Sequence, residues 1–216
     1  NLVGLVISSG VVNISGGAFA SCYSLPSITI PGSVVTIGTN AFDHCTNLSS
    51  VIISASVPKI GTNAFRLCTS LTSVIIPNSV TNINSFAFAS CSNLFSVYFM
   101  GNAPSANSSV FTNDLSATVY YLLGTAGWGS TFGGRPTAVW QPKILTTDTS
   151  FGVQTNQFGF NISWANGEAV VVEACTDLSK PVWQPLQTNT LIGGVAYFSD
   201  SQATNYPSRF YRISSQ

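Results

Sequence analysis

Four of the five cysteines recur at a fixed interval of 23 residues, at Cys22, Cys45, Cys68 and Cys91. Such a set could ligate zinc or form disulfides. If each interval is one coil of a stacked structure, however, the thiols form a line about 4.8 Å apart, the spacing of neighbouring strands. A line cannot converge on a tetrahedral metal ion, and its Cβ atoms lie farther apart than the roughly 3.8 Å of a disulfide. We therefore expect a buried, reduced cysteine ladder and no metal site, and a further core thiol at Cys175.

The other candidates for chemistry are weak. The single histidine, His44, follows Asp43, but its repeat position holds Ser21, Leu67 and Ser90 in other copies, which is typical of a solvent-facing position. A triad needs a histidine held between a nucleophile and an acid. The glycine-rich stretch 124–134 matches neither the dinucleotide fingerprint nor the phosphate loop. We expect no catalytic residue, no enzyme activity and no cofactor.

The elements that position these residues repeat with the same interval of 23. Three further features keep this interval: a helical turn with an Ala-Phe pair, a leucine, and a three-residue strand of mostly apolar residues. The pairs are Ala18-Phe19, Ala41-Phe42, Ala64-Phe65 and Ala87-Phe88; the leucines are Leu25, Leu48, Leu71 and Leu94; the strands are 28–30, 51–53, 74–76 and 97–99. A second apolar pair follows each strand, as in Val34 and Ile37.

One unit therefore reads as one coil of a solenoid: a strand, a turn, a short second strand and a helical turn. A single coil cannot shield its own apolar side chains, but stacked coils share one continuous core. The period of two along a strand points the first and third residues inward, with the leucines, phenylalanines and cysteines, and the middle residue outward.

The repeat resembles the BspA-like class of bacterial leucine-rich repeats, through motifs such as Ser-Val-Val-Thr-Ile-Gly-Thr-Asn-Ala-Phe-Asp-His-Cys-Thr-Asn-Leu at 33–48. The resemblance covers residues 1 to about 100. It implies a protein that is secreted or surface-anchored and that serves in adhesion or protein interaction.

The pattern decays after residue 100: Met100 replaces a proline, Ala103 and Ala106 replace larger apolar residues, and the Ala-Phe-Cys turn is not expected to return. We predict a solenoid over 1–113, of about four repeats with a truncated start, and a cap and linker over 114–142. That cap holds one final strand and aromatic residues, including Trp128 and Trp140, which cover the terminal coil. Because the chain begins with Asn1 inside a partial repeat, we expect a processed or truncated product.

Residues 143–216 predict a small antiparallel β-sandwich, so the fold class is mainly β. Alternation at 158–164 indicates a strand, and Asn166-Gly167 predicts a hairpin into a strand at 169–174. Further strands are expected at 143–148, 186–192, 195–199 and 209–213. Glu173 is expected to pair across strands with Arg209 or Arg212. Motifs of residues 143–216, such as Val-Val-Glu-Ala-Cys-Thr-Asp-Leu, resemble a C-terminal module of secreted bacterial proteins.

Only 6% of the residues are charged, and seven basic residues balance seven acidic ones. Nucleic acid is disfavoured as a partner, because the first 113 residues carry only Asp43, Lys59 and Arg66 as full charges. No apolar run reaches the ~20 residues that cross a bilayer, so no membrane insertion is expected. A neutral surface rich in Ser, Thr and Asn suits an extracellular or cell-surface protein.

The best candidate for a binding surface is the row of outward strand residues Thr29, Ile52, Ile75 and Tyr98, since repeat proteins bind through such extended faces. The alternative is that these residues only favour β structure. The four tryptophans could stack on sugars, but their contexts favour core or cap positions. We therefore predict a module that binds a protein or glycan, or alternatively a subunit that assembles with copies of itself into an extracellular fibre or layer.

Overall fold

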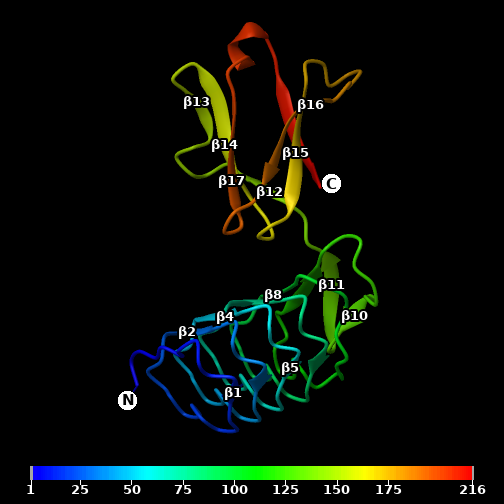
Figure 1. Ribbon diagram of the computed structural model, residues 1–216. Helices are drawn as coiled ribbons and strands as arrows, with labels where there is room; N and C mark the ends of the chain where they lie inside the picture. The colour runs from blue at the N-terminus through cyan, green and yellow to red at the C-terminus, as the bar shows by residue number, and fades with distance from the viewer. Residues whose placement is uncertain (1, 216) are drawn as a thin grey trace. The chain divides into compact units, whose positions relative to one another are not determined.

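The computed structural model describes residues 2–215 and divides into two compact units, Asn1–Trp140 and Gln141–Gln216 (Figure 1). The first unit is a solenoid of parallel strands and the second contains antiparallel sheets. The mainly-β fold class predicted from the sequence is confirmed.

Two sets of strands run along the solenoid, one short and one long. The short strands β1 (Asn13–Ile14), β3 (Thr36–Ile37), β5 (Lys59–Ile60) and β7 (Asn82–Ile83) form one parallel sheet in that order. The long strands are β2 (Ser27–Ile30), β4 (Ser50–Ile53), β6 (Ser73–Ile76), β8 (Ser96–Phe99), β9 (Thr118–Tyr121) and β11 (Arg135–Val139). Partners in the sheet are one repeat apart, as in Ile28 with Val51 and Ile75 with Tyr98. β4 and β6 are neighbours in the stack but belong to separately hydrogen-bonded sheets.

The core consists of columns of identical side chains. The phenylalanines Phe19, Phe42, Phe65 and Phe88 stack with ring centroids 5.3 Å apart at each step. The leucines and the inward strand residues are buried beside them, whereas the middle strand residues Thr29, Ile52 and Ile75 are exposed. The inward and outward assignments made from the sequence are therefore confirmed for these strands.

The Ala-Phe-Cys segment is a run of tight turns rather than an α-helix. Hydrogen bonds join residues three apart, such as Asp43 N to Asn40 O at 3.2 Å and Cys45 N to Phe42 O at 3.3 Å. Two residues in each turn have left-handed backbone, for example Asn40 with φ 56° and His44 with φ 61°. These residues interrupt the helical path, and N–H groups then bond to the next coil, as in Phe42 N to Ala64 O at 2.8 Å.

The repeat continues further than the sequence analysis predicted. The Ala-Phe-Cys residues do not return, as predicted, but the turn itself does, because Val110-Phe111 occupies its place and the Phe111 ring lies 5.9 Å from that of Phe88. Strand β9 then pairs with β8, but at an interval of 22 residues, with Ser96 opposite Thr118. Relative to the earlier coils, this coil has one residue fewer before β9, Val110 in place of alanine and Asp114 in place of cysteine. The interval of 23 therefore does not reveal it as a full repeat.

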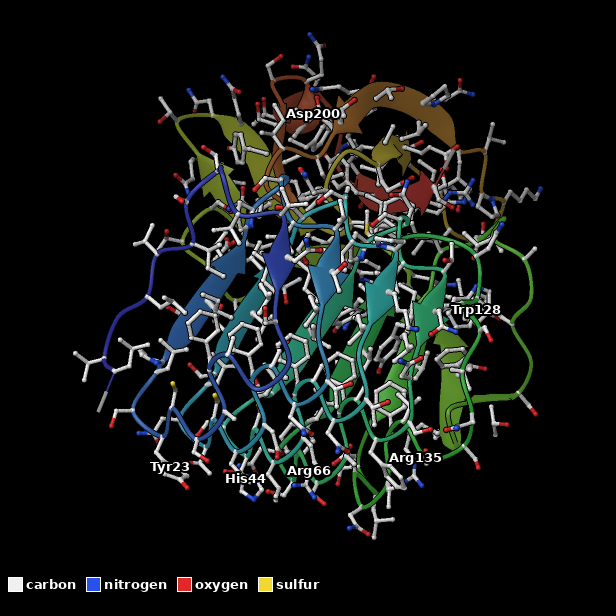
Figure 2. The ribbon with its side chains drawn as sticks, turned by 60° about the horizontal axis from the view of Figure 1, so that its bottom comes forward. Tyr23, His44, Arg66, Trp128, Arg135 and Asp200 are labelled. Carbon is white, nitrogen blue, oxygen red and sulfur yellow. The ribbon has the colours of Figure 1, made fainter. Side chains whose placement is uncertain are left out.

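Beyond β9, the chain covers the last coil with one more parallel strand and a group of aromatic rings. Strand β11 pairs with β9, and β10 (Thr131–Phe132) forms a hairpin with β11. Trp128 and Phe132 meet Phe99 edge-on at 4.9 Å and 5.2 Å. Figure 2 shows Trp128 at this end of the coils. These rings provide the apolar cover that a terminal coil requires.

The second unit consists of two antiparallel sheets. In one sheet β14 (Gln157–Ser163) pairs with β12 (Lys143–Leu145), β13 (Gly152–Gln154) and β17 (Val195–Asp200). In the other, β15 (Ala169–Cys175) pairs with β16 (Gln184–Thr190) and β18 (Phe210–Ser215), and a short 3₁₀ helix spans Ala203–Asn205. Contacts from Phe158 and Phe160 of β14 to Tyr211 of β18 join the two sheets.

The predicted hairpin at Asn166-Gly167 was wrong. β14 and β15 lie on either side of this turn but belong to different sheets. The turn chemistry is as expected, since Gly167 has φ 86°, but Gly167 N bonds to Leu191 O at 2.8 Å and Gly193 N bonds to Asn166 Oδ1 at 2.7 Å. Local turn residues therefore reversed the chain without fixing the partner of the strand. The pairing of Glu173 with Arg212 is confirmed, at 2.7 Å, whereas Arg209 pairs with Asp200 instead.

Candidate binding surface

The outward middle residues of β2, β4, β6, β8 and β9 form a single row, which we call the outer row: Thr29, Ile52, Ile75, Tyr98 and Tyr120. Sheet register places Thr29 beside Ile52, Ile75 beside Tyr98, and Tyr98 beside Tyr120. Ile52 and Ile75 are 57% and 50% exposed. The sequence named the first four members, and the structure brings them together on one face; the fifth, Tyr120, was missed because the repeat interval shortens before β9.

The aromatic end of the outer row is a packed group rather than a series of isolated side chains. The Tyr98 ring stacks on that of Tyr120 at 5.1 Å and lies 4.5 Å from that of Trp140. These contacts leave Tyr98 half-buried, whereas Thr29, Ile52 and Ile75 are exposed. Rings held in this way lose little further freedom when a partner docks against them.

Hydroxyl groups border the outer row. The first residue of β2, β4, β6, β8 and β9 also faces outward, and this position holds Ser27, Ser50, Ser73, Ser96 and Thr118. None of these residues carries a charge. The face therefore has an apolar centre and a neutral, hydroxyl-bearing margin, which is the pattern of a protein-binding surface.

Two of the charged residues of the coils, Asp43 and Arg66, lie on the turns, whereas Lys59 lies on β5. Arg66 donates two hydrogen bonds to Asp43 in the preceding coil, from Nε to Oδ1 and from Nη2 to Oδ2, both at 2.9 Å. His44 Nδ1 lies 3.0 Å from Asp43 Oδ2. Burial raises the pKa of Asp43, but the hydrogen bonds from Arg66 and His44 outweigh it and hold that pKa below its ordinary value. The arrangement fastens two coils together, and His44 is partly exposed.

The cysteine ladder packs inside the solenoid. Cys45, Cys68 and Cys91 are buried and Cys22 is half-buried, and all are free thiols. Each buried thiol donates a hydrogen bond to the carbonyl of the phenylalanine 26 residues earlier, such as Cys45 Sγ to Phe19 O at 3.2 Å and Cys91 Sγ to Phe65 O at 3.1 Å. Burial raises the pKa of Cys45 to about 11 and the pKa values of Cys68 and Cys91 further. These thiols are therefore protonated packing groups.

Asp114 occupies the cysteine position of the fifth coil and was not singled out from the sequence. It is 1% exposed, and its carboxylate oxygens have no hydrogen-bond partner within residues 2–215. Arg135 Nη1 donates instead to the Asp114 main-chain carbonyl at 3.2 Å. Burial raises the pKa of Asp114 to about 7, although the nearby main-chain N–H of Cys91 and the positive charge of Arg135 oppose this shift. The change from Cys to Asp at the interval of 23 was the available signal.

No helix in residues 2–215 is long and apolar enough to cross a membrane. No cluster of three or more potential metal-binding side chains occurs among the same residues.

Comparison with solved structures finds leucine-rich repeat proteins from three bacteria. A leucine-rich cell surface protein of Faecalibacterium prausnitzii is 33% identical over 53% of this chain and 31% of its own, with a TM-score of 0.49. The leucine-rich repeat protein of T. pallidum is 32% identical over 51% of this chain and 52% of its own, with a TM-score of 0.49. One from Bacteroides ovatus is 27% identical over 51% of this chain and 35% of its own, with a TM-score of 0.38.

The chain thus spans between about a third and a half of the length of these relatives. No curated protein matches it. The family model of the BspA type leucine-rich repeat region matches residues 1–118 in six copies, which is more than half of the chain. The resemblance of the C-terminal unit to a module of secreted proteins stays a prediction. The stacked coils, their repeated side chains and this match together show that the chain belongs to the BspA type leucine-rich repeat family.

Proposed function

We propose that this chain is a non-enzymatic interaction module at the cell surface or outside the cell, and that its outer row binds a protein partner. The observation that carries the proposal is the exposed pair Ile52 and Ile75, aligned with the aromatic group of Tyr98, Tyr120 and Trp140. The neighbouring serine positions are neutral, so an approaching partner meets no charge that must lose its water.

The tyrosine and tryptophan side chains of the outer row and its aromatic group are residue types that supply much of the binding energy in protein interfaces. Interface hot spots are enriched in tyrosine and tryptophan, and they are ringed by residues that exclude water. The row lies on hydrogen-bonded strands, so its side chains are held on a rigid scaffold. Replacing two half-exposed isoleucines of a docked row by threonine removes roughly 2 kcal/mol of apolar contact, or about 30-fold in affinity.

The test compares two double variants that use residues already present in the repeat. The test variant, Ile52→Thr with Ile75→Thr, places at both positions the residue that Thr29 provides in the outer row. Val12→Thr with Val35→Thr is the control, because these valines are 50% and 43% exposed on the short-strand face and their repeat position holds Thr81 in a later coil.

Wild-type protein is screened against an array of purified secreted and surface-exposed proteins, and the affinity of each hit is then measured by surface plasmon resonance. We expect the outer-row variant to lose about 30-fold in affinity and the control to bind as wild type. Equal binding by both variants would show that the outer row is not the docking surface.

The second candidate is self-assembly through the first coil. This coil presents apolar side chains around a pocket of about 270 Å³, lined in part by Leu5, Ile7, Val11 and Phe19. Val6, which also lines the pocket, is 92% exposed. Contact between this face and a second copy would shield these side chains. The molar mass measured by light scattering at rising concentration tests this candidate, and a constant monomer mass up to high micromolar concentration would refute it.

A further inference from the structure

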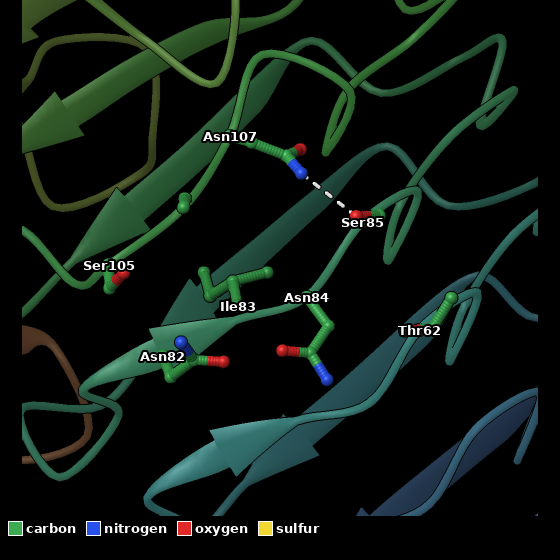
Figure 3. A pocket seen from close by; sticks show the side chains of 8 residues that line it. Thr62, Asn82, Ile83, Asn84, Ser85, Ser105 and Asn107 are labelled. Atoms are coloured by element: carbon green, nitrogen blue, oxygen red, sulfur yellow. Dashed lines mark hydrogen bonds between the residues drawn. The ribbon is translucent and has the colours of Figure 1, made fainter.

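A second pocket opens on the face formed by the short strands, whereas the outer row lies on the long strands. It has a volume of about 440 Å³ and lies beside β7 (Figure 3). Its lining comes from three coils: Thr62, the segment 82–85 and the segment 105–107. The inference drawn from it does not depend on the proposed function of the outer row.

The pocket arises from two departures from the repeat. The inward isoleucine of the short strands, Ile14, Ile37, Ile60 and Ile83, is replaced in the fifth coil by Ala106, which is exposed. The next position holds Gly38 and Gly61 in earlier coils but Asn84 and Asn107 in later ones. A Cβ atom at Gly61 would lie 2.6 Å from the main chain of Gly38, so a side chain at this position would collide with the preceding coil.

The main-chain ladder between coils is interrupted at the same place. Gly61 N bonds to Ile37 O at 3.0 Å and Asn84 N bonds to Ile60 O at 3.0 Å, but the corresponding bond from Asn107 N to Ile83 O is missing within residues 2–215. The edge of β7 is nevertheless occupied, because Ile83 N bonds to Ser105 O at 2.9 Å and Ser105 N bonds to Thr81 O. A peptide therefore cannot add to this edge as a strand.

The pocket carries side-chain donors and acceptors that the protein leaves unused. The side chains of Asn82, Asn84, Thr62 and Ser105 form no hydrogen bond within residues 2–215, and Asn82 Oδ1 is buried without a partner. By contrast, Asn107 is held in place: its Nδ2 donates to Ser85 Oγ at 2.8 Å, as Figure 3 shows, and its Oδ1 accepts from Ser109. Every lining residue is uncharged.

We propose that this pocket binds a neutral saccharide unit of a glycan. A sugar hydroxyl both donates and accepts hydrogen bonds, and an asparagine amide offers one group of each kind. The Asn84 amide, with the hydroxyls of Thr62 on the preceding coil and Ser105 on the following coil, presents such groups around a space in the size range of ligand pockets. The lining itself offers no positive charge to a phosphate or carboxylate, since Lys59, the sheet neighbour of Asn82, is not among the lining residues. The exposed Ala106 offers a small apolar contact to the C–H face of a ring.

The experiment titrates the isotope-labelled full chain with maltotriose, cellotriose and mannotriose, and follows amide chemical shifts by NMR. The test variant, Asn84→Gly, carries the residue found at Gly38 and Gly61, so it suits the same backbone. The control is Asn47→Gly, the same change at an exposed turn of the second coil. A second variant, Ala106→Ile, restores the isoleucine of the earlier coils and fills space beside the pocket.

At least one trisaccharide is expected to shift the amides of residues 62, 82–85 and 105–107, with millimolar affinity because the pocket is open to solvent. Asn84→Gly is expected to weaken binding on the order of tenfold, Ala106→Ile to weaken it as well, and Asn47→Gly to leave it unchanged. The proposal is overturned if none of the three sugars shifts these amides, or if the shifts map to another face or survive both pocket variants.

Discussion

Replacing Phe65 by alanine tests whether the stacked phenylalanines hold the coils together. Phe65 is fully buried and lies between Phe42 and Phe88, with ring centroids 5.3 Å from each. Truncating a buried phenylalanine to alanine costs about 4 kcal/mol, which includes the cavity that it leaves. Phe19 offers the internal control, because it is half-buried and stacks on Phe42 alone. Phe19→Ala should cost about 2 kcal/mol or less.

The two costs are best measured by hydrogen exchange with mass spectrometry across a urea series. The chain has two units, so a single unfolding curve would mix their transitions. Peptides from the coils report the free energy of opening of the solenoid, and peptides from 143–216 serve as an internal reference. We expect Phe65→Ala to lower the stability of the coils on both sides by about twice as much as Phe19→Ala. Equal costs, or a loss confined to one coil, would refute the idea of a shared core column.

Three further predictions follow from the repeat positions. Phe86 has φ 60° where Asn40 and Asn63 stand in earlier coils, so Phe86→Asn should raise the stability of the coils by about 1 kcal/mol relative to Phe86→Ala, measured by the same hydrogen exchange; coils less stable than in Phe86→Ala would contradict this. Burial raises the pKa values of Cys45, Cys68 and Cys91, so iodoacetamide at pH 8 should label the half-buried Cys22 first, as read by peptide mass spectrometry; labelling of all four at one rate in the folded protein would be inconsistent with the ladder. Because burial raises the pKa of Asp114 to about 7, the folded state binds its proton more tightly than the unfolded state, and the free energy of unfolding from this group falls as pH rises from about 4 to 7. Asp114→Asn should remove this part of the pH dependence and stabilise the coils at pH 8 by roughly 4 kcal/mol; an unchanged pH profile of hydrogen exchange would count against a buried carboxyl.

Regular repetition made most of the solenoid predictable. An interval of 23 fixes which side chains meet in neighbouring coils, and alternation along a strand separates Ile28 and Ile30, which are buried, from Thr29, which is exposed. These are local consequences of chain geometry, so no knowledge of distant contacts was needed. The outer row could be named for the same reason.

The parts that escaped prediction depend on contacts between distant segments or on a break in the interval. Tyr98 is less exposed than Ile75 because Tyr120 and Trp140 stack against it, and no periodicity relates Trp140 to Tyr98. Asn166-Gly167 reverses the chain, but the sheet that receives β15 is decided by its pairing with β16 and β18. Local turn chemistry carries no information about that choice.

The pocket beside β7 could be predicted only in part from the sequence. The replacement of larger apolar residues by Ala103 and Ala106 is visible in the sequence and indicates a change in the coil. That this change leaves the Asn84 side chain without a hydrogen bond within residues 2–215 depends on how far the fifth coil departs from the fourth, which only the structure shows.

The central claim is that a protein partner docks on the outer row. Hydroxyl-radical footprinting of the complex with the highest-affinity array hit tests it most directly, because oxidation reports the solvent exposure of individual side chains. The account predicts protection of Ile52, Ile75 and Tyr98, while the exposed Tyr23 and Phe86 on the turns stay as reactive as in the free chain. Protection of the turns, with the outer row still oxidised at its free rate, would contradict it.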